Sequence, residues 1–118
     1  MRRLLLLLVL IATPALGQER TPAVRESLTD LAFILGQAHA LRTRCAGEGD
    51  QVWRARMMRM VEIEQPDEAF REQLFEDFNT GFLGAQASHP RCNAAARAEA
   101  TRVAARGRDL ARVLAGAR

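Results

Sequence analysis

Apolar residues recur three and four positions apart along most of this 118-residue chain, and no segment alternates as a β-strand does. That spacing places apolar side chains along one face of an α-helix. Prolines, glycines and capping residues divide the pattern into four segments joined by short turns. The sequence therefore predicts an all-α fold, a compact antiparallel four-helix bundle with one disulfide.

Capping and breaking residues set the expected bounds of the four helices. Side chains that accept a hydrogen bond favour a helix N-terminus, and Gly or Pro commonly ends a helix. The expected N-caps are Thr21, Asp50 and Asn93, and the third helix is expected from about Asp67. The expected ends are the glycine-rich turn 46–49, Pro66 and residues 88–90.

Each segment has one face that we expect to be buried. On the first helix this face includes Cys45, which extends the apolar row instead of facing water. The full predicted faces are Val24, Leu28, Leu31, Leu35, Ala38 and Cys45; Trp53, Met57, Met60 and Glu64; Phe70, Leu74, Phe78, Gly81, Phe82 and Ala85; and Ala96, Ala100, Val103, Gly107, Leu110 and Leu114.

The N-terminus has the three parts of an export signal. Arg2 and Arg3 precede the apolar residues 4–12, and Ala15–Gly17 is a small-x-small cleavage site. The apolar run is well short of the roughly 20 residues needed to span a bilayer, which favours cleavage after Gly17 over an uncleaved anchor. We expect residues 1–17 to be a signal peptide and residues 18–118 a single helical domain, periplasmic or secreted, with no stable membrane span after cleavage.

The net charge argues against nucleic acid as a partner. The full chain carries +3, but two of its 17 basic residues lie in the predicted signal peptide, so 15 bases and 14 acids leave +1. A nearly neutral exported domain lacks the electrostatic basis for binding a polyanion. The expected partner is instead an envelope protein or a cell-wall component, and the sequence does not set the oligomeric state.

Two cysteines, Cys45 and Cys92, are present. Two cysteines in an oxidising compartment usually pair, and the absence of a Cys-x-x-Cys motif argues against thiol oxidoreductase chemistry. Zinc is the alternative, because His39 and His89 precede the two cysteines. The six-residue step from His39 to Cys45 turns about 120° away from alignment on a helix, so a structural disulfide is favoured.

Acidic and basic residues separate along the chain. Residues 62–77 hold seven acids against Arg71 alone, whereas seven arginines from Arg91 onward face two acids. One interpretation is two solvated faces that attract each other across the bundle. The other is that the basic fourth helix binds an acidic envelope polymer or partner protein.

Met57 and Met60 share a helix face and, with His39, form a candidate soft-metal site for copper. Methionine also fills irregular cores, and Trp53 lies on the same face, so core packing is the favoured interpretation. No metal site is therefore assigned, and no cofactor is expected, since the haem motif Cys-x-x-Cys-His is absent.

Hydrolysis requires paired carboxylates or a nucleophile with a base, and the sequence shows neither clearly. Glu62 and Glu64 are two residues apart and do not face each other on a helix. Glu64 falls at the inward edge of its helix, where Arg54 or Arg56 would pair with it across the bundle. A structural ion pair is favoured over a general acid, and no catalytic residue is assigned.

The run Phe78-Asn79-Thr80-Gly81-Phe82 is unusual inside a helix, because Asn and Gly both weaken helices. Gly81 indicates close helix packing or a kink. Asn79 either bonds to a turn such as 45–50 or offers its amide to a ligand.

An ordered set of short motifs spans nearly all of the chain beyond residue 17. The motifs are Leu41-Arg42, Cys45, Trp53-Arg54-x-Arg56-Met57, Glu64-x-Pro66, Phe78-Asn79-x-Gly81-Phe82, Cys92, and Ala105-Arg106-Gly107 with Leu110. With these motifs the chain resembles a family of short exported alphaproteobacterial proteins of unknown function that have two well-separated cysteines. The resemblance implies an envelope location and a Cys45–Cys92 disulfide, and it implies no activity.

Together these features predict a periplasmic, non-catalytic binding or accessory module of the cell envelope. Its expected partner-binding surface combines Trp53, Arg54 and Arg56 with the turn 45–50, Asn79, and arginines of the fourth helix such as Arg106. Two alternatives remain open at this point: copper binding through Met57, Met60 and His39, and a cell-wall hydrolase or its activator that uses Glu64.

Overall fold

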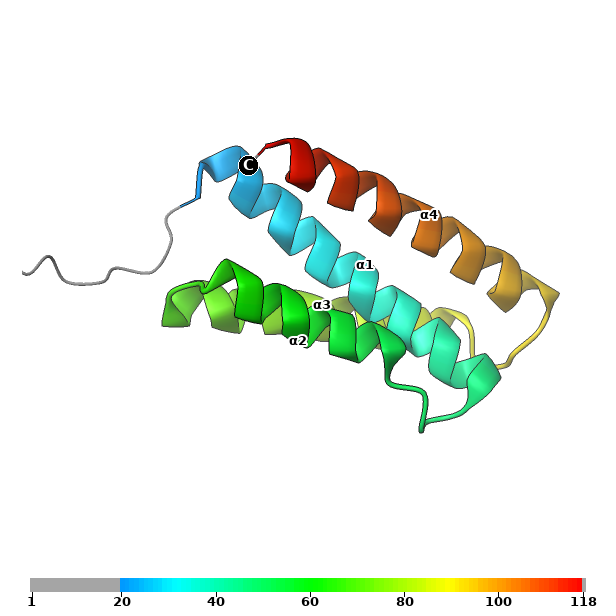
Figure 1. The fold of residues 1–118 in the computed structure, drawn as a ribbon. Coiled ribbons are helices and arrows are strands. Elements are labelled where there is room, and N and C mark those ends of the chain that lie inside the picture. Colours follow the sequence, from blue (N-terminus) through cyan, green and yellow to red (C-terminus); the bar gives the residue numbers. More distant parts are fainter. Residues whose placement is uncertain (1–19, 118) are drawn as a thin grey trace, which may run out of the picture.

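The computed structural model describes residues 20–117, so the predicted signal peptide and its cleavage site lie outside the described residues. Four helices and no strand make up the described part: α1 (Pro22–Ala46), α2 (Val52–Glu64), α3 (Glu68–Ser88) and α4 (Ala94–Gly116), as Figure 1 shows. The predicted all-α fold is confirmed. None of the described helices has both the length and the apolar character that crossing a bilayer requires.

Two of the three predicted N-caps, Thr21 and Asn93, are confirmed, and Asp67, where the third helix was expected to begin, is the N-cap of α3. Thr21, Asp67 and Asn93 each accept a hydrogen bond from the backbone N–H three residues later, at 3.2, 2.8 and 2.9 Å. These bonds satisfy donors that the first turn of a helix leaves without a partner. At the other end of α1, Gly47 adopts a φ of 100°, which suits glycine and turns the chain out of the helix.

The prediction that Asp50 caps α2 is wrong, because Gln51 occupies the N-cap position and makes no side-chain cap bond. The Asp50 carboxylate instead accepts a hydrogen bond from Nε of Arg42 at 2.8 Å and a longer one from the backbone N–H of Val52 at 3.3 Å. These bonds hold the pKa of Asp50 below its usual range. The carboxylate therefore connects the end of α1 to the start of α2.

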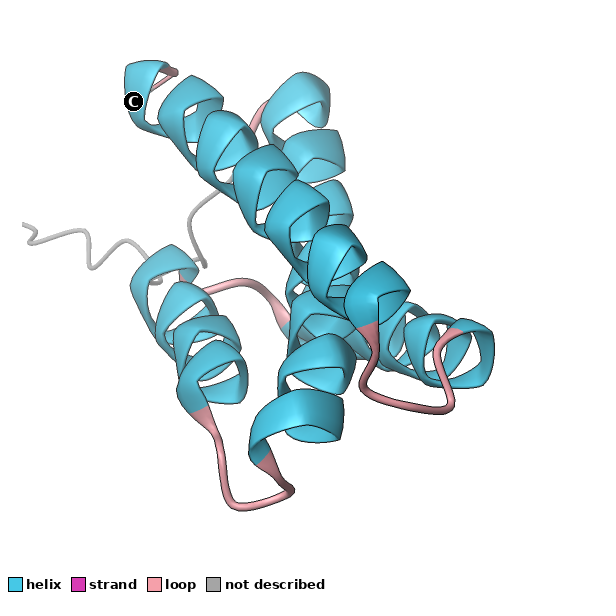
Figure 2. Ribbon diagram, turned by 90° about the vertical axis from the view of Figure 1, so that its right-hand side faces the viewer, coloured by secondary structure: helices cyan, strands magenta, loops and turns pink. Residues whose placement is uncertain are grey.

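The helices run up and down in turn, and α1 is the one that packs against all three others. Its most extensive contact is with α3, which runs parallel to it, while α2 and α4 run antiparallel to it (Figure 1). Figure 2 shows the helices and their connecting loops from the side. The backbones of α2 and α4 do not meet. The bundle is thus built around the α1–α3 pair, with α2 and α4 as separate flanking helices.

Two glycines allow the backbones of α1 and α3 to touch. A Cβ at Gly36 would overlap the carbonyl oxygen of Phe78, and a Cβ at Gly81 would overlap that of Phe33. Each glycine therefore faces the backbone of the opposite helix, and neither site has room for a side chain. Gly81 marks close packing, which resolves the two readings of the Asn-x-Gly run; Gly36 has the same role.

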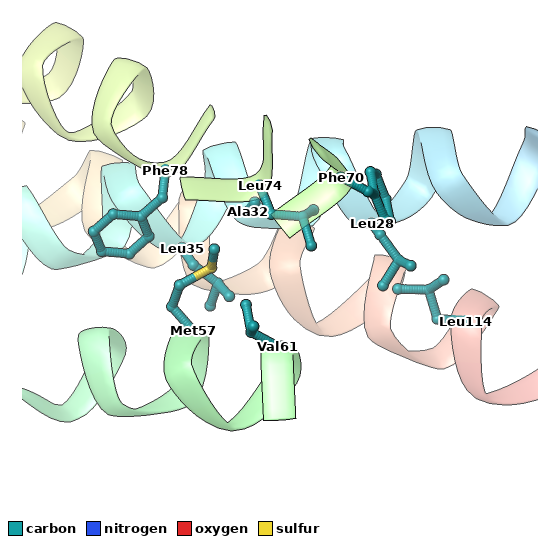
Figure 3. Close-up of a cluster of buried hydrophobic side chains, with 9 residues drawn as sticks. All are labelled: Leu28, Ala32, Leu35, Met57, Val61, Phe70, Leu74, Phe78 and Leu114. Carbon is teal, nitrogen blue, oxygen red and sulfur yellow. The ribbon is translucent and has the colours of Figure 1, made fainter. Parts of the chain in front are cut away.

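The core consists of two buried clusters along α1. The larger one joins side chains from all four helices, as Figure 3 shows: Leu28, Ala32, Leu35, Met57, Val61, Phe70, Leu74, Phe78 and Leu114. The smaller one contains Ala38, Ala40, Leu41, Ala85, Ala96 and Val103. Trp53 packs against both clusters, so this half-buried ring connects them.

The predicted disulfide is confirmed: Cys45 and Cys92 are bonded, across 47 positions of sequence. The prediction that Cys45 lies in the buried row of α1 is wrong, because both cysteines are exposed. Helix α1 has passed the end of the core by this point, and the sulfur turns outward to meet the α3–α4 loop.

Arg44, next to the disulfide, strengthens the same junction. Its guanidinium donates to the carbonyl of His89 at 3.0 Å and to that of Gln86 at 3.1 Å. These carbonyls lie at the C-terminal end of α3, where a positive charge is favourable. The end of α3 and the loop that leads to α4 are therefore held to α1 by two hydrogen bonds and a covalent bond.

Alanine substitutions at two helical glycines should separate the effect of the backbone contact between α1 and α3 from the effect of helix propensity. We expect Gly81→Ala to lower the free energy of unfolding by about 2 kcal/mol or more, because the added methyl group meets backbone that cannot move aside cheaply. Gly84→Ala is the matched control, since a Cβ there meets nothing within 4 Å. It should raise stability by about 0.5–1 kcal/mol through helix propensity. Urea denaturation of both variants checks this, and equal effects would contradict it.

Removal of the disulfide should cost a large share of the stability. On the chain-entropy model, a loop of 47 positions corresponds to about 4 kcal/mol. Because both cysteines are exposed residues, the double variant Cys45→Ser/Cys92→Ser places each hydroxyl at the surface and isolates the loss of the bond. Urea denaturation measures the difference. Alkylation of the unreduced wild type should label no thiol, and two labelled thiols would refute the bond.

Candidate functional site

A groove of about 550 Å³ lies between the two flanking helices α2 and α4. Leu31 and Leu35 of α1 line it, together with Trp53 and Met60 of α2. The α4 wall consists of small residues: Ala104, Gly107, Ala111 and Ala115. Because these residues project little, and because α2 and α4 do not meet, apolar side chains of α1 remain reachable from outside.

Three arginines also line the groove: Arg56 from α2, and Arg108 and Arg112 from α4. The guanidinium of Arg56 lies over the ring of Trp53, 4.8 Å from its centroid. Cation–π contact of this kind orients both side chains. Arg112 forms only a long, exposed pair with Asp109 at 3.7 Å. The groove thus combines an apolar lining with positive charge from both of its walls.

A second, smaller hollow of about 190 Å³ is formed by side chains of α1, α2 and α3. Its polar residues are His39, Arg54 and Asn79, one from each helix. Its apolar residues are Met57, Met58, Phe75, Phe78 and Phe82. Since α2 and α3 touch only sparsely, a space remains where their faces diverge above α1.

His39 is buried, with only 7% of its surface exposed, among aromatic rings. The ring centroids of Phe78 and Phe82 lie 5.8 and 5.4 Å away. Nδ1 is shielded from water and has no hydrogen-bond partner among the described residues. Burial lowers the pKa of His39, and the positive charge of Arg54 lowers that pKa further, while Asp50 acts in the opposite direction. The imidazole is therefore held in its neutral form.

The structure divides the predicted partner-binding surface in two. Trp53 and Arg56 line the groove, whereas Arg54 and Asn79 line the smaller hollow. Asn79 is exposed, and its side chain makes none of the side-chain hydrogen bonds described for residues 20–117, so no bond to the turn 45–50 is seen. Arg106 lines neither hollow and lies 3.5 Å from Glu99 within α4. Arg106 is thus separated from the other candidates.

The zinc alternative is wrong, because the disulfide consumes both cysteine sulfurs. Within the described part of the chain, no three His, Cys, Asp or Glu side chains come together as a metal-binding group. The copper hypothesis loses its proposed geometry as well: Met57 and His39 line the smaller hollow, but Met60 lines the groove. Met57 is 1% exposed and belongs to the core.

Glu64 is buried, with 2% of its surface exposed, as its inward position predicted. Among residues 20–117 it pairs with Arg20, whose Nε lies 3.0 Å from Oε2, and not with Arg54 or Arg56. A carboxylate that is buried against a cation is a structural ion pair of the expected kind. This contact holds the start of the described chain against the end of α2.

One interpretation of the sequence was that the acidic segment 62–77 attracts the arginines of α4 across the bundle. The ion pairs described for α4 do not include any residue of that segment. Glu99 forms ion pairs with Arg102 at 2.8 Å and with Arg106 at 3.5 Å, and Asp109 forms one with Arg112. All three pairs lie within α4. These pairs hold the pKa of Glu99 below its usual range. Exposed pairs of this kind contribute little to stability.

Several residues of both hollows were not predicted from sequence. Arg108 and Arg112 were predicted only as two of the seven arginines from Arg91 onward, and His39 was named only as a possible metal ligand. Gly36 had a detectable signal, because a glycine inside a long helical pattern usually has a packing reason. The openness of the groove had no detectable signal in the sequence, since it depends on the distance between α2 and α4.

These features define a small, disulfide-bridged, all-α protein in which the groove and the smaller hollow differ in chemistry. A family profile matches residues 24–117, and the chain belongs to that family, described as protein of unknown function (DUF2385). No curated protein and no solved structure matches the chain.

The lowered pKa of His39 should appear in the pH dependence of stability. Below about pH 6.5 the unfolded chain binds a proton at His39 more readily than the folded chain does, so stability falls as the pH drops through this interval. We expect His39→Gln to reduce the loss of stability measured by urea denaturation between about pH 7.5 and pH 5.5. His89→Gln is the control and should retain the wild-type loss. Identical losses in both variants would contradict the assignment.

Proposed function

We propose that this protein is an exported, non-catalytic accessory module that binds an amphipathic helix of a partner protein in the cell envelope. The groove between α2 and α4 is the binding surface. An acidic edge on the partner helix meets the arginines of the groove, and its apolar face meets α1. The single observation that carries this proposal is an apolar groove lined by arginines from both flanking helices.

The shape of the groove supports a helical occupant. Its α4 wall extends from Ala104 to Ala115, about 16 Å along a helix, which is three turns. A helix that docks in a groove buries apolar side chains spaced three and four apart. Small side chains along α4 allow the backbone of such a helix to approach closely.

The composition of the groove also suits protein recognition. Trp53 is half-buried and held in place by Arg56 above it and by the core below it. Tryptophan and arginine are the residues most often found to dominate binding energy at protein interfaces. Arg108 and Arg112 add positive charge on the opposite wall, which favours an acidic partner and speeds its association.

Two observations support an exported location. The sequence of residues 1–17 has the pattern of a signal peptide. The disulfide between exposed cysteines is also typical of an oxidising compartment, because the reducing cytosol does not preserve such bonds.

A photo-crosslinking amino acid at Ala111 tests the proposal in intact cells that express the protein. Ala111 is exposed and lines the groove, and Ala98 is an exposed position on α4 that does not. We expect mass spectrometry to find, at position 111 only, a crosslinked peptide with helical apolar spacing and an acidic edge. Arg108→Glu should abolish the adduct by reversing the charge beside it, whereas Arg91→Glu, the matched reversal away from the groove, should preserve it.

Other adducts would overturn the proposal. A second copy of this chain, a lipid, or a peptidoglycan fragment at position 111 would each identify a different occupant. Equal capture at positions 98 and 111, or no adduct at 111, would show that the groove does not bind a partner helix.

A further inference from the structure

We propose that the smaller hollow, formed by His39, Arg54, Asn79 and the surrounding Phe and Met side chains, is a separate binding site for a small organic carboxylate. It differs from the groove in its lining and its volume, about 190 Å³ against about 550 Å³. The inference does not depend on the partner helix, because the two hollows share no lining residue.

Three different polar groups converge on this hollow from three helices. Arg54 supplies only donors and a fixed positive charge, Asn79 supplies a donor and an acceptor, and His39 supplies a neutral imidazole. Pockets that bind small ligands typically pair an apolar lining with a few polar groups of this kind. Both Arg54 and Asn79 are exposed, so they stand at the mouth, while His39 is buried.

His39 is the buried polar residue of the hollow, beside the exposed donors of Arg54 and Asn79. A buried polar atom without a hydrogen bond is unfavourable, and native proteins seldom retain one. Nδ1 of His39 is such an atom among the described residues, and the imidazole lines the hollow. The rings of Phe78 and Phe82 pack against it, so the imidazole is fixed in position. Because Nδ1 is shielded, a ligand meets only the part of the imidazole that lines the hollow, and the donors of Arg54 and Asn79 hold the ligand there.

The charges select an anion and not a metal cation. Arg54 is the charged residue that lines the hollow, so it repels a bound cation, whereas Asp50, the nearby acid, lies outside the lining and already accepts a hydrogen bond from Arg42. No acid is among the lining residues, and no group of three metal-binding side chains exists in the described chain. A carboxylate matches the forked donors of Arg54 and accepts in addition from the Asn79 amide.

The lining also limits the remainder of the ligand. Three phenylalanine rings and two methionines surround the polar groups, and such side chains favour a flat or compact apolar body. The volume corresponds to about six water molecules at about 30 Å³ each. A ligand of this size has one acidic group on a short apolar or aromatic body, and a long acyl chain does not fit.

Benzoate is the probe, and benzamide is its neutral counterpart of the same shape. We expect titration of isotope-labelled protein, followed by NMR to about 10 mM ligand, to give saturable shifts at His39, Met57 and Phe78 with benzoate. Benzamide should bind at least tenfold more weakly, because it lacks the charge that pairs with Arg54. Residues of the groove, such as Ala111, should not shift.

Two arginine variants distinguish a specific site from general attraction to a basic protein. Arg54→Gln should weaken benzoate binding at least tenfold, and Asn79→Leu should weaken it as well. Arg59→Gln removes the same charge from the same helix outside this hollow and should leave the affinity unchanged. Ala111→Trp fills the groove and should also leave benzoate binding intact, so failure of the groove proposal is distinguishable from failure of this one.

Three results would overturn the inference. The first is the absence of any saturable shift at the residues of the hollow. The second is equal affinity for benzoate and benzamide, which would mean that charge plays no part. The third is equal weakening by Arg54→Gln and Arg59→Gln, which would indicate that benzoate responds only to net charge.

Discussion

The backbone contact between α1 and α3 determines the rest of this architecture. Gly36 and Gly81 allow two parallel helices to approach until a carbonyl of each lies where the other helix would carry a Cβ. In a bundle whose helices alternate in direction, the first and third helices usually lie diagonally opposite each other. Here these two helices, α1 and α3, make the most extensive contact. The other two helices pack against α1 and remain apart from each other. This separation leaves apolar side chains of α1 accessible.

The same arrangement produces two hollows with different chemistry on either side of α2. On one side, α2 and α4 enclose a groove with small, apolar side chains and arginines from both walls. On the other, α2 and α3 diverge above His39 and leave a pocket with aromatic walls. Consecutive residues of α2 contribute to opposite hollows: Trp53 lines the groove and Arg54 lines the pocket. Helical periodicity makes this division inevitable, since adjacent residues point about 100° apart.

Local signals predicted the helices well, because capping, glycine turns and apolar spacing act within a few residues. Thr21, Asp67 and Asn93 hold their predicted positions, and so does the disulfide. The errors concern partners that are distant in sequence. Asp50 bonds Arg42 instead of capping α2, Glu64 pairs with Arg20, and Cys45 lies beyond the core. The site was predicted as one surface because Trp53, Arg54 and Arg56 are close together in the sequence. Their side chains point in different directions around α2, so Trp53 and Arg56 line the groove and Arg54 lines the smaller hollow.

The position of the disulfide has a consequence for the integrity of the chain. Cys45 and Cys92 close a covalent ring that contains all of α2 and α3, while α1 up to its last turn and the whole of α4 extend from that ring as two arms. A protease that nicks one peptide bond anywhere inside the ring leaves a single molecule, with both arms still attached. In an environment rich in proteases, the bridge therefore preserves the connection between α1 and α4 after a break in the backbone that joins them.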